Sequence, residues 1–336
     1  MPRPHRLTLN EHPLPPLDSV AAEIARHTAE VNRYPEFYPE RLRGIVADWL
    51  GLPGEQIVLG AGSVGVALQA LQASVSAGGG LAYGWRNFDA YPLLAGMVGA
   101  RRVEVPLLPG GHQDLEALAK AVQDADAVIV CNPHNPTGRL VPGDELREFI
   151  ARVPEHVLVV LDEAYIEFVA PSGRTDSLGW IREFPNLLVL RTFSKAWGLA
   201  NMRVGYGVTS PRWAERIGRY QLPYALSTLS AVAVETSLRA RPELEERIAV
   251  IVGERERLSG GLTRGGWTVL PSHTNFLWLD EPERTEDIRL ALEGEGVQAR
   301  VYAGEGVRVT VGDTDANDSV LRALAQGPSF GPASAA

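Results

Sequence analysis

The residues that could carry chemistry most directly lie in one short segment around Lys195. An apolar run at residues 187–190 predicts a buried strand, and Ser194 and Lys195 come just after its end. Lys195 is one of two lysines among 32 basic residues, so the chain otherwise uses arginine for positive charge. A lysine at this position suits chemistry that needs a neutral amine, such as Schiff-base formation, better than a surface role.

A carboxylate and an amide follow two other predicted strands. Asp162 comes directly after the apolar run 157–161, where a buried carboxylate is costly unless a cation lies beside it. Asn135 lies in the proline-rich segment 132–138, which follows the run 127–130. The alternative interpretation of this segment is an ordinary Asn-Pro turn.

Two further segments could bind anions. Ala61, Gly62 and Ser63 follow a predicted strand and begin a helix, whose first N–H groups and partial positive charge attract anions. A plain strand–helix turn is the alternative. Arg308 lies in the short apolar strand 307–311 and needs an anionic partner, which a carboxylate could supply through two parallel hydrogen bonds.

The elements that position these residues follow a regular pattern. Between residues 57 and 190, apolar strands alternate with helices, which predicts an α/β fold with a mostly parallel sheet between helices. Ligands of such folds bind beyond the carboxyl ends of the strands, where the residues above fall. After residue 208 the pattern predicts helices at 211–220 and 227–264, and then a smaller α+β domain. The strands of that domain are predicted at 267–270, 275–279, 297–301 and 307–311.

This pattern divides the chain into four parts. We expect an N-terminal arm and helix at 1–35, a large domain at 36–225, a small domain at 226–326 and a tail at 327–336. The arm up to residue 16 is rich in Pro and is expected to be irregular. The tail is rich in Gly, Pro, Ser and Ala and is expected to be mobile.

Composition narrows the class of protein. A hydrophobic content of 45% and a charged content of 22% are typical of a soluble globular protein. A net charge of −9 without any basic block disfavours nucleic acid as a partner. Cys131 is the single cysteine, which favours a reducing compartment. No signal peptide or membrane-spanning run is predicted, so we expect a cytoplasmic protein without a membrane partner.

Several motifs together resemble one enzyme family. The segment RTFSKAWGLANMRVGY at 191–206 resembles the lysine signature of fold-type I aminotransferases that depend on pyridoxal phosphate (PLP). NPHNPTG at 132–138, DEAY at 162–165 and GVRVTVG at 306–312 also match this family. The resemblance covers residues 9–312 and is closest to the histidinol-phosphate aminotransferase branch, which includes relatives that act on aromatic amino acids.

The resemblance implies catalytic roles for Lys195, Asp162 and Tyr165, and a cofactor-binding role for Asn135. Lys195 would hold PLP as a Schiff base and then move the substrate proton as general base and acid. Asp162 would keep the pyridine nitrogen of PLP protonated, so that the ring accepts electrons. Asn135 and Tyr165 would bond the phenolic oxygen of PLP. No metal is implied.

The remaining implied contacts concern the cofactor phosphate, its ring face and the substrate. Ser194 and Arg203 would join Ala61, Gly62 and Ser63 around the phosphate. Phe88 would stack on the ring, although a core position explains this aromatic residue equally well. Arg308 would bind the substrate α-carboxylate, and Arg300 would lie near the substrate side chain. Tyr34 would reach the phosphate of the neighbouring subunit, which implies a homodimer with a shared active site.

The chain departs from the family pattern near the substrate. The N-terminal arm, which folds over the substrate in relatives, here lacks their aromatic residue and glycine. Trp197 is unusually large, Asn201 replaces a common glycine, and both are expected at substrate-facing or loop positions. His134 replaces the usual asparagine and is expected to be peripheral. These changes leave the cofactor machinery intact and affect the substrate.

The resulting prediction is a PLP-dependent aminotransferase. It would move an amino group between histidinol phosphate or an aromatic amino acid and 2-oxoglutarate in a ping-pong cycle. The alternative is a lyase or decarboxylase with a specialised substrate, because a fold does not fix the reaction. A PLP-binding regulatory protein is disfavoured, because it would normally carry a DNA-binding domain and would not need Lys195, Asp162 and Arg308.

Overall fold

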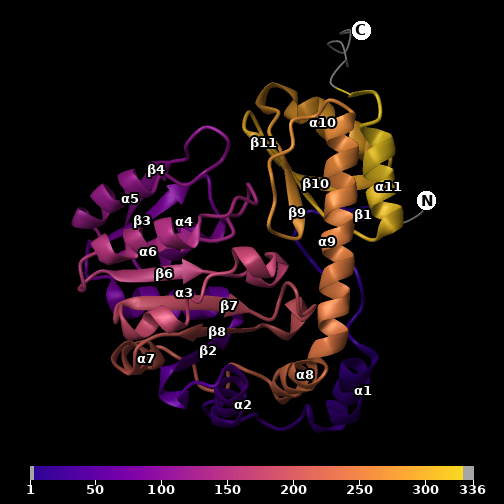
Figure 1. The fold of residues 1–336 in the computed structure, drawn as a ribbon. Coiled ribbons are helices and arrows are strands. Elements are labelled where there is room, and N and C mark those ends of the chain that lie inside the picture. Colours follow the sequence, from indigo (N-terminus) through magenta and orange to yellow (C-terminus); the bar gives the residue numbers. More distant parts are fainter. Residues whose placement is uncertain (1–3, 328–336) are drawn as a thin grey trace.

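The computed structural model describes residues 4–327 and contains two β-sheets (Figure 1). All of the predicted mobile tail except Gly327 lies outside the described residues. Within residues 4–327, no helix is both long enough and apolar enough to cross a bilayer.

The larger sheet has seven strands in the order β2-β8-β7-β6-β5-β3-β4. All neighbouring strands are parallel except those that pair with β8, which confirms the predicted α/β fold. The sequence analysis did not identify β3 and β8, both of which contain glycine inside the strand. The strands are β2 (Ile57–Ala61), β3 (Gly80–Trp85), β4 (Arg101–Pro106), β5 (Ala127–Cys131), β6 (Leu158–Asp162), β7 (Leu187–Thr192) and β8 (Val204–Val208).

Both faces of the larger sheet are buried. In β6, Val159 and Leu161 belong to one hydrophobic core, whereas Leu158 and Val160 belong to another, and all four are fully buried. Because successive strand residues point to opposite faces, this pattern requires cover on each side. The covering helices are α2 (Glu40–Leu50), α3 (Gly62–Ser74), α4 (Ala90–Met97), α5 (Leu115–Ala121), α6 (Gly143–Arg152) and α7 (Pro211–Gly218).

The smaller sheet has four strands in the order β1-β10-β11-β9 and packs beside helices (Figure 1). The expectation of an irregular N-terminal arm is wrong at β1, which pairs in parallel with β10. The expected strand at 267–270 is also wrong, because only an isolated bridge from Val269 to Leu279 forms there. The elements are β1 (His5–Leu7), β9 (Phe276–Leu279), β10 (Val297–Tyr302), β11 (Gly306–Thr310), α10 (Thr285–Gly294) and α11 (Thr314–Ala323).

Two helices replace the single helical stretch expected at 227–264. They are α8 (Thr228–Arg239) and α9 (Arg241–Arg264), and they meet at Ala240. Pro242 lies in the first turn of α9, where its missing N–H costs nothing, whereas a continuous helix would lose a hydrogen bond there. Helix α8 packs against α1 (Asp18–His27), and α9 runs from there to the smaller sheet (Figure 1).

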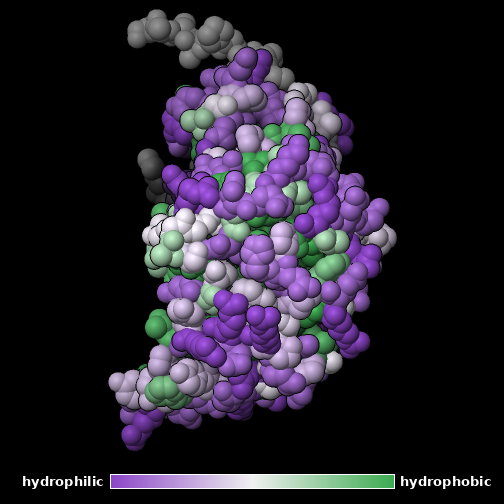
Figure 2. Space-filling model, turned by 90° about the vertical axis from the view of Figure 1, so that its left-hand side faces the viewer, coloured by the Kyte–Doolittle hydropathy of each residue, from purple (hydrophilic) through white to green (hydrophobic). Residues whose placement is uncertain are grey.

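The surface is mainly polar, as the charged fraction of the chain leads us to expect. The face shown in Figure 2 is mainly hydrophilic, and its apolar side chains form small separate areas. Larger exposed apolar side chains occur together in the segments 31–38 and 220–224, among them Val31, Tyr34, Phe37, Leu222 and Tyr224.

Candidate active site

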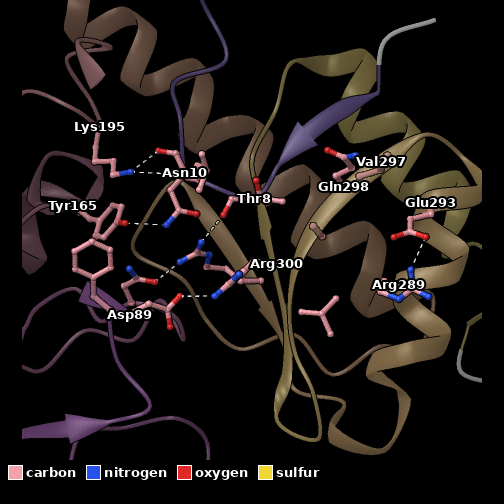
Figure 3. Close-up of a pocket in the computed structure, with 16 residues that line it drawn as sticks. Thr8, Asn10, Asp89, Tyr165, Lys195, Arg289, Glu293, Val297, Gln298 and Arg300 are labelled. Atoms are coloured by element: carbon pink, nitrogen blue, oxygen red, sulfur yellow. Dashed lines mark hydrogen bonds and ion pairs between the residues drawn. The ribbon is translucent and has the colours of Figure 1, made fainter. Parts of the chain in front are cut away.

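Lys195 lies in the loop after β7, at the carboxyl edge of the larger sheet. It lines a cavity of about 610 Å³ and a neighbouring one of about 210 Å³. Its Nζ donates hydrogen bonds to the carbonyl oxygens of Leu9 at 2.8 Å and Asn10 at 3.1 Å (Figure 3). Burial, together with the positive charge of Arg308, lowers the pKa of Lys195 to about 8, which makes the neutral amine accessible near neutral pH.

Asp162 ends β6 in the same cavity system. Its Oδ2 accepts a hydrogen bond from the Tyr91 hydroxyl at 2.6 Å, and its Oδ1 accepts one from the Ala164 N–H at 3.1 Å. Burial raises the pKa of Asp162 to about 6 despite these bonds. Both donors are neutral, so a cationic group beside the carboxylate would offset the remaining desolvation cost.

Tyr91 is a site residue that the sequence analysis missed. It lies on α4 and is buried, and burial with the adjacent carboxylate raises its pKa well above the usual range. Its ring meets that of Phe88 edge-on, with centroids 5.6 Å apart. Tyr91 could have been predicted from its position three residues after Phe88, because residues three apart lie on one face of a helical turn.

Asn135, Tyr165 and Phe88 surround the same space. All three line both cavities. Oδ1 of Asn135 accepts a hydrogen bond from Arg308 Nη1 at 2.5 Å, and burial raises the pKa of Tyr165. The structure therefore brings these predicted residues together with Lys195.

The predicted phosphate cradle forms at the start of α3. A Cβ added to Gly62 would lie 2.3 Å from Arg203 Nη2, and one added to Gly205 would lie 2.1 Å from the Ser63 nitrogen. Only glycine therefore permits this close approach of arginine and backbone. Nη1 of Arg203 lies 3.3 Å from Ser194 Oγ, and both residues line the smaller cavity with Ser63.

Ala61 contributes differently from its neighbours. It is absent from the linings of the two cavities, and its carbonyl oxygen lies 3.4 Å from Arg203 Nη2. Ala61 therefore orients the arginine and does not face the cavity space.

The two predicted substrate arginines have different environments. Arg308 and Arg300 oppose each other in the β10–β11 register and line the larger cavity. Arg308 is 6% exposed, donates to the Thr8 carbonyl at 2.6 Å, and has a buried Nε without a partner within residues 4–327. Arg300 is about half exposed and forms an ion pair with Asp89 at 2.9 Å.

The N-terminal arm closes the site through Asn10, which the sequence analysis did not select. Asn10 is 1% exposed, and its Nδ2 donates to the Tyr165 hydroxyl at 2.9 Å (Figure 3). Its backbone N–H donates to Thr310 Oγ1, which in turn donates to Asn10 Oδ1. The Asn275 side chain donates to the Asn10 carbonyl. The arm is thus bonded directly to two predicted catalytic side chains.

Three other predicted positions lie apart from the cavities. Trp197 is not substrate-facing, because its ring packs in the core edge-on against Trp49 and donates to Glu167. His134, expected to be peripheral to the chemistry, lines neither cavity; it is fully buried and bonded to Thr137 at 2.8 Å.

Tyr34 is 84% exposed, packs against Tyr224, and lines neither cavity. Within one chain, Tyr34 therefore does not join the site.

The described residues fit the cofactor that the sequence implies. The close approach at Gly62 and Gly205 leaves N–H groups and an arginine for a phosphate. The buried Asp162 carboxylate suits a protonated pyridine nitrogen, and Lys195 is a buried amine with a lowered pKa. Phosphate binder, carboxylate and amine therefore occur in one cavity system, as a flat phosphorylated aldehyde requires.

Comparison with known proteins agrees with this geometry. A family model described as "Aminotransferase class I and II" matches residues 5–324. The chain is 47% identical to an aromatic amino acid aminotransferase of Thermobifida fusca, across 95% of this chain and 89% of that protein. It is 45% identical to an aromatic amino acid aminotransferase of Streptomyces avermitilis, across 96% of this chain and 90% of that protein.

A solved structure shows the same fold. Histidinol-phosphate aminotransferase from Sinorhizobium meliloti in complex with pyridoxal-5'-phosphate superposes with a TM-score of 0.90 at 27% identity, across 96% of this chain and 91% of that chain. The chain therefore belongs to the aminotransferase class I and II family, with the fold-type I architecture and pyridoxal phosphate as its cofactor.

Proposed function

We propose that this aminotransferase takes its amino group from an aromatic amino acid and passes it to 2-oxoglutarate in a ping-pong cycle. The observation that carries the proposal is Arg308, which lines the same cavity as Lys195 and whose buried Nε has no partner within residues 4–327. A buried arginine of this kind suits an α-carboxylate. Every α-amino acid carries that group beside its amine, whereas histidinol phosphate lacks it.

The names of relatives support the aromatic donor. The Thermobifida and Streptomyces proteins at 45–47% identity are both called aromatic amino acid aminotransferases. Histidinol phosphate is the second candidate, because the Sinorhizobium enzyme of the same fold carries that name.

In this proposal, two groups of residues hold the cofactor at its ends. Ser63, Ser194 and Arg203 would bind the phosphate through N–H, hydroxyl and guanidinium donors. Gly62, whose N–H donates to the Arg203 carbonyl, makes room for that arginine, and the carbonyl of Ala61 orients it. Charge-assisted bonds of this kind anchor the cofactor independently of the reaction.

A second group fixes the ring. Asp162, held by Tyr91, would pair with the pyridine nitrogen and keep it protonated. Asn135 and Tyr165 bond the phenolic oxygen, and Phe88 covers one ring face. When bound, pyridoxal phosphate supplies a carbonyl that condenses with amines and a ring that accepts electrons.

Lys195 moves the proton. Its Nζ takes up the proton from the donor Cα, for which the lowered pKa of about 8 is suitable, because a general base works best near the ambient pH. Arg308 orients the donor by its carboxylate, so that Cα faces this amine. The N-terminal arm, bonded to Tyr165 through Asn10, excludes water from the same space.

A homodimer completes the proposed site. Tyr34 and Tyr224 lie in the exposed apolar segments 31–38 and 220–224, which suit burial against a second copy of the chain. Tyr34 would then reach the partner's phosphate cradle. The domain division at residues 36–225 and 226–326 and a cytoplasmic location stay predictions of the sequence.

A lyase or decarboxylase is the alternative reaction class. The L-threonine-O-3-phosphate decarboxylase from Porphyromonas gingivalis has the same fold, but its identity of 21% supports a likeness of fold alone. The reaction class must therefore be measured.

The deciding experiment supplies phenylalanine, tyrosine, tryptophan or histidinol phosphate singly, with 2-oxoglutarate, and identifies the products by mass spectrometry. We expect the aromatic 2-oxo acid and glutamate in equal amounts. A higher kcat/KM with histidinol phosphate would select the second donor. Release of carbon dioxide without consumption of the acceptor would show a decarboxylase.

A further inference from the structure

Asp89 makes an unexpected contact for its position. It directly precedes α4, at the N-cap, where an aspartate normally accepts a hydrogen bond from the first turn of its helix. Asp89 accepts no such bond. Its Oδ2 instead lies 2.9 Å from Nη2 of Arg300 on β10, 211 residues away (Figure 3).

This contact makes Arg300 unlike Arg308, although the two face each other across neighbouring strands. Arg308 is buried and its Nε has no partner among residues 4–327, whereas the charge of Arg300 is already balanced by Asp89. The two residues line one cavity, so a substrate meets an available cation at one and a neutralised cation at the other.

The positive charge of a second arginine in the lining of this cavity is also balanced by a carboxylate. Arg289, which also lines the cavity, pairs with Glu293 at 2.6 Å. Outside the cavity lining, Arg86 lies over the Tyr302 ring at 5.5 Å, as Arg300 does, and pairs with Glu305. Besides Arg308 and Lys195, the cationic side chains that line this cavity are Arg289 and Arg300, and each of these two is paired with a carboxylate.

We propose that Asp89 determines the donor specificity by neutralising Arg300, so that this end of the cavity rejects a phosphate group and accepts a neutral aromatic side chain. The inference rests on the proposed aminotransferase function and identifies the residue that separates its two candidate donors. A phosphate dianion at Arg300 would meet the Asp89 carboxylate, and like charges brought together disfavour binding. A neutral ring leaves the ion pair intact and can stack on the guanidinium.

The test replaces Asp89 by asparagine, which keeps the shape and removes the charge. In holoenzyme, kcat/KM is measured for histidinol phosphate and for histidinol, which differ only in the phosphate. We expect the ratio of the two values to rise about tenfold, equivalent to about 1.4 kcal/mol. The inhibition constant of inorganic phosphate against phenylalanine should fall by a similar factor, which provides a readout independent of histidinol phosphate turnover.

Two variants control for other causes. Glu305→Gln removes a carboxylate from the neighbouring Arg86 pair without touching Arg300, and it should leave the ratio and the inhibition constant unchanged. In an Arg300→Gln background, Asp89→Asn should no longer produce a gain, because Asp89 acts through that arginine. Turnover of phenylalanine by each variant reports that the site has assembled.

The outcomes separate this inference from the proposed function. An unchanged ratio and inhibition constant in Asp89→Asn, an equal gain in Glu305→Gln, or a gain that persists without Arg300 would each overturn the role of Asp89. A failure of the proposed function appears in the wild-type protein instead, as a preference for histidinol phosphate over phenylalanine or as decarboxylation.

Discussion

Replacing Asn10 with alanine should loosen the N-terminal arm over the cavity. The Asn10 side chain forms two buried hydrogen bonds, to the Tyr165 hydroxyl at 2.9 Å and to Thr310 Oγ1 at 3.1 Å. Its backbone has φ 54°, in the left-handed region that asparagine tolerates and alanine does not. The backbone bonds to Lys195, Asn275 and Thr310 remain in the variant.

The magnitude follows from these contacts. Each lost buried hydrogen bond costs about 1 kcal/mol, and the left-handed backbone adds about 1 kcal/mol for alanine. Opening of the arm should therefore become easier by about 3 kcal/mol, or roughly 150-fold. Asn10→Gly loses the same bonds without the backbone cost, so it should change opening by about 2 kcal/mol, or roughly 30-fold.

Hydrogen exchange of the holoenzyme measures this opening. The rate for a peptide that covers residues 5–14, followed by mass spectrometry, reports the local opening equilibrium. Peptides from β6 serve as an internal control, because the core of the larger sheet should keep its protection in both variants.

The order of the variants decides whether the reasoning is correct. Wild-type exchange should be slowest, Asn10→Gly intermediate and Asn10→Ala fastest. Wild-type protection in both variants would show that this side chain does not hold the arm. Equal loss in the two variants would refute the backbone contribution.

Other predictions concern the cofactor and substrate residues. Lys195→Ala should abolish both the visible absorbance of the cofactor–lysine linkage and turnover, and retention of both would refute the assignment. Apoprotein should react with pyridoxal phosphate at a rate that rises with pH and is half-maximal near pH 8, because only the neutral amine of Lys195 reacts; a midpoint near the ordinary lysine pKa would contradict this. The native pKa of Asp162, about 6, lies above its unfolded value. The contribution of Asp162 to the free energy of unfolding of the apoprotein is therefore fully present below pH 4 and is lost as pH rises through 6. Tyr91→Phe removes a hydrogen bond to the Asp162 carboxylate and should raise that native pKa further, by about one unit. The free energy of unfolding, measured in urea titrations, should then fall more between pH 5 and 8 than in the wild-type protein. An unchanged pH dependence would show that the Tyr91 hydroxyl does not stabilise the carboxylate. Arg308→Lys should raise KM for phenylalanine about tenfold or more, because lysine cannot bind a carboxylate through two parallel bonds; an unchanged KM would remove Arg308 from the substrate site.

The sequence by itself determined the fold class and most of the cavity. Apolar strands alternating with helices required a parallel sheet, and the carboxyl ends of such strands converge on one edge. Lys195, Asp162 and Asn135 each follow one of those strands, so their proximity could be predicted from order along the chain. Gly62 could be predicted in the same way, because local backbone geometry at a strand–helix junction selects glycine.

Only the tertiary structure decided which side chains hold these residues in place. Tyr91 and Asp162 are 71 positions apart, Asn10 and Tyr165 are 155 apart, and Asp89 and Arg300 are 211 apart. Each pair joins elements whose relative position depends on packing of the whole chain, and no local periodicity encodes it. Residues 5–7 of the arm form a strand for the same reason: pairing of β1 with β10 uses backbone N–H and carbonyl groups, which every residue except proline supplies. Residue types therefore determined the chemistry available at the cavity, whereas long-range packing decided which charges there are free and which are already neutralised.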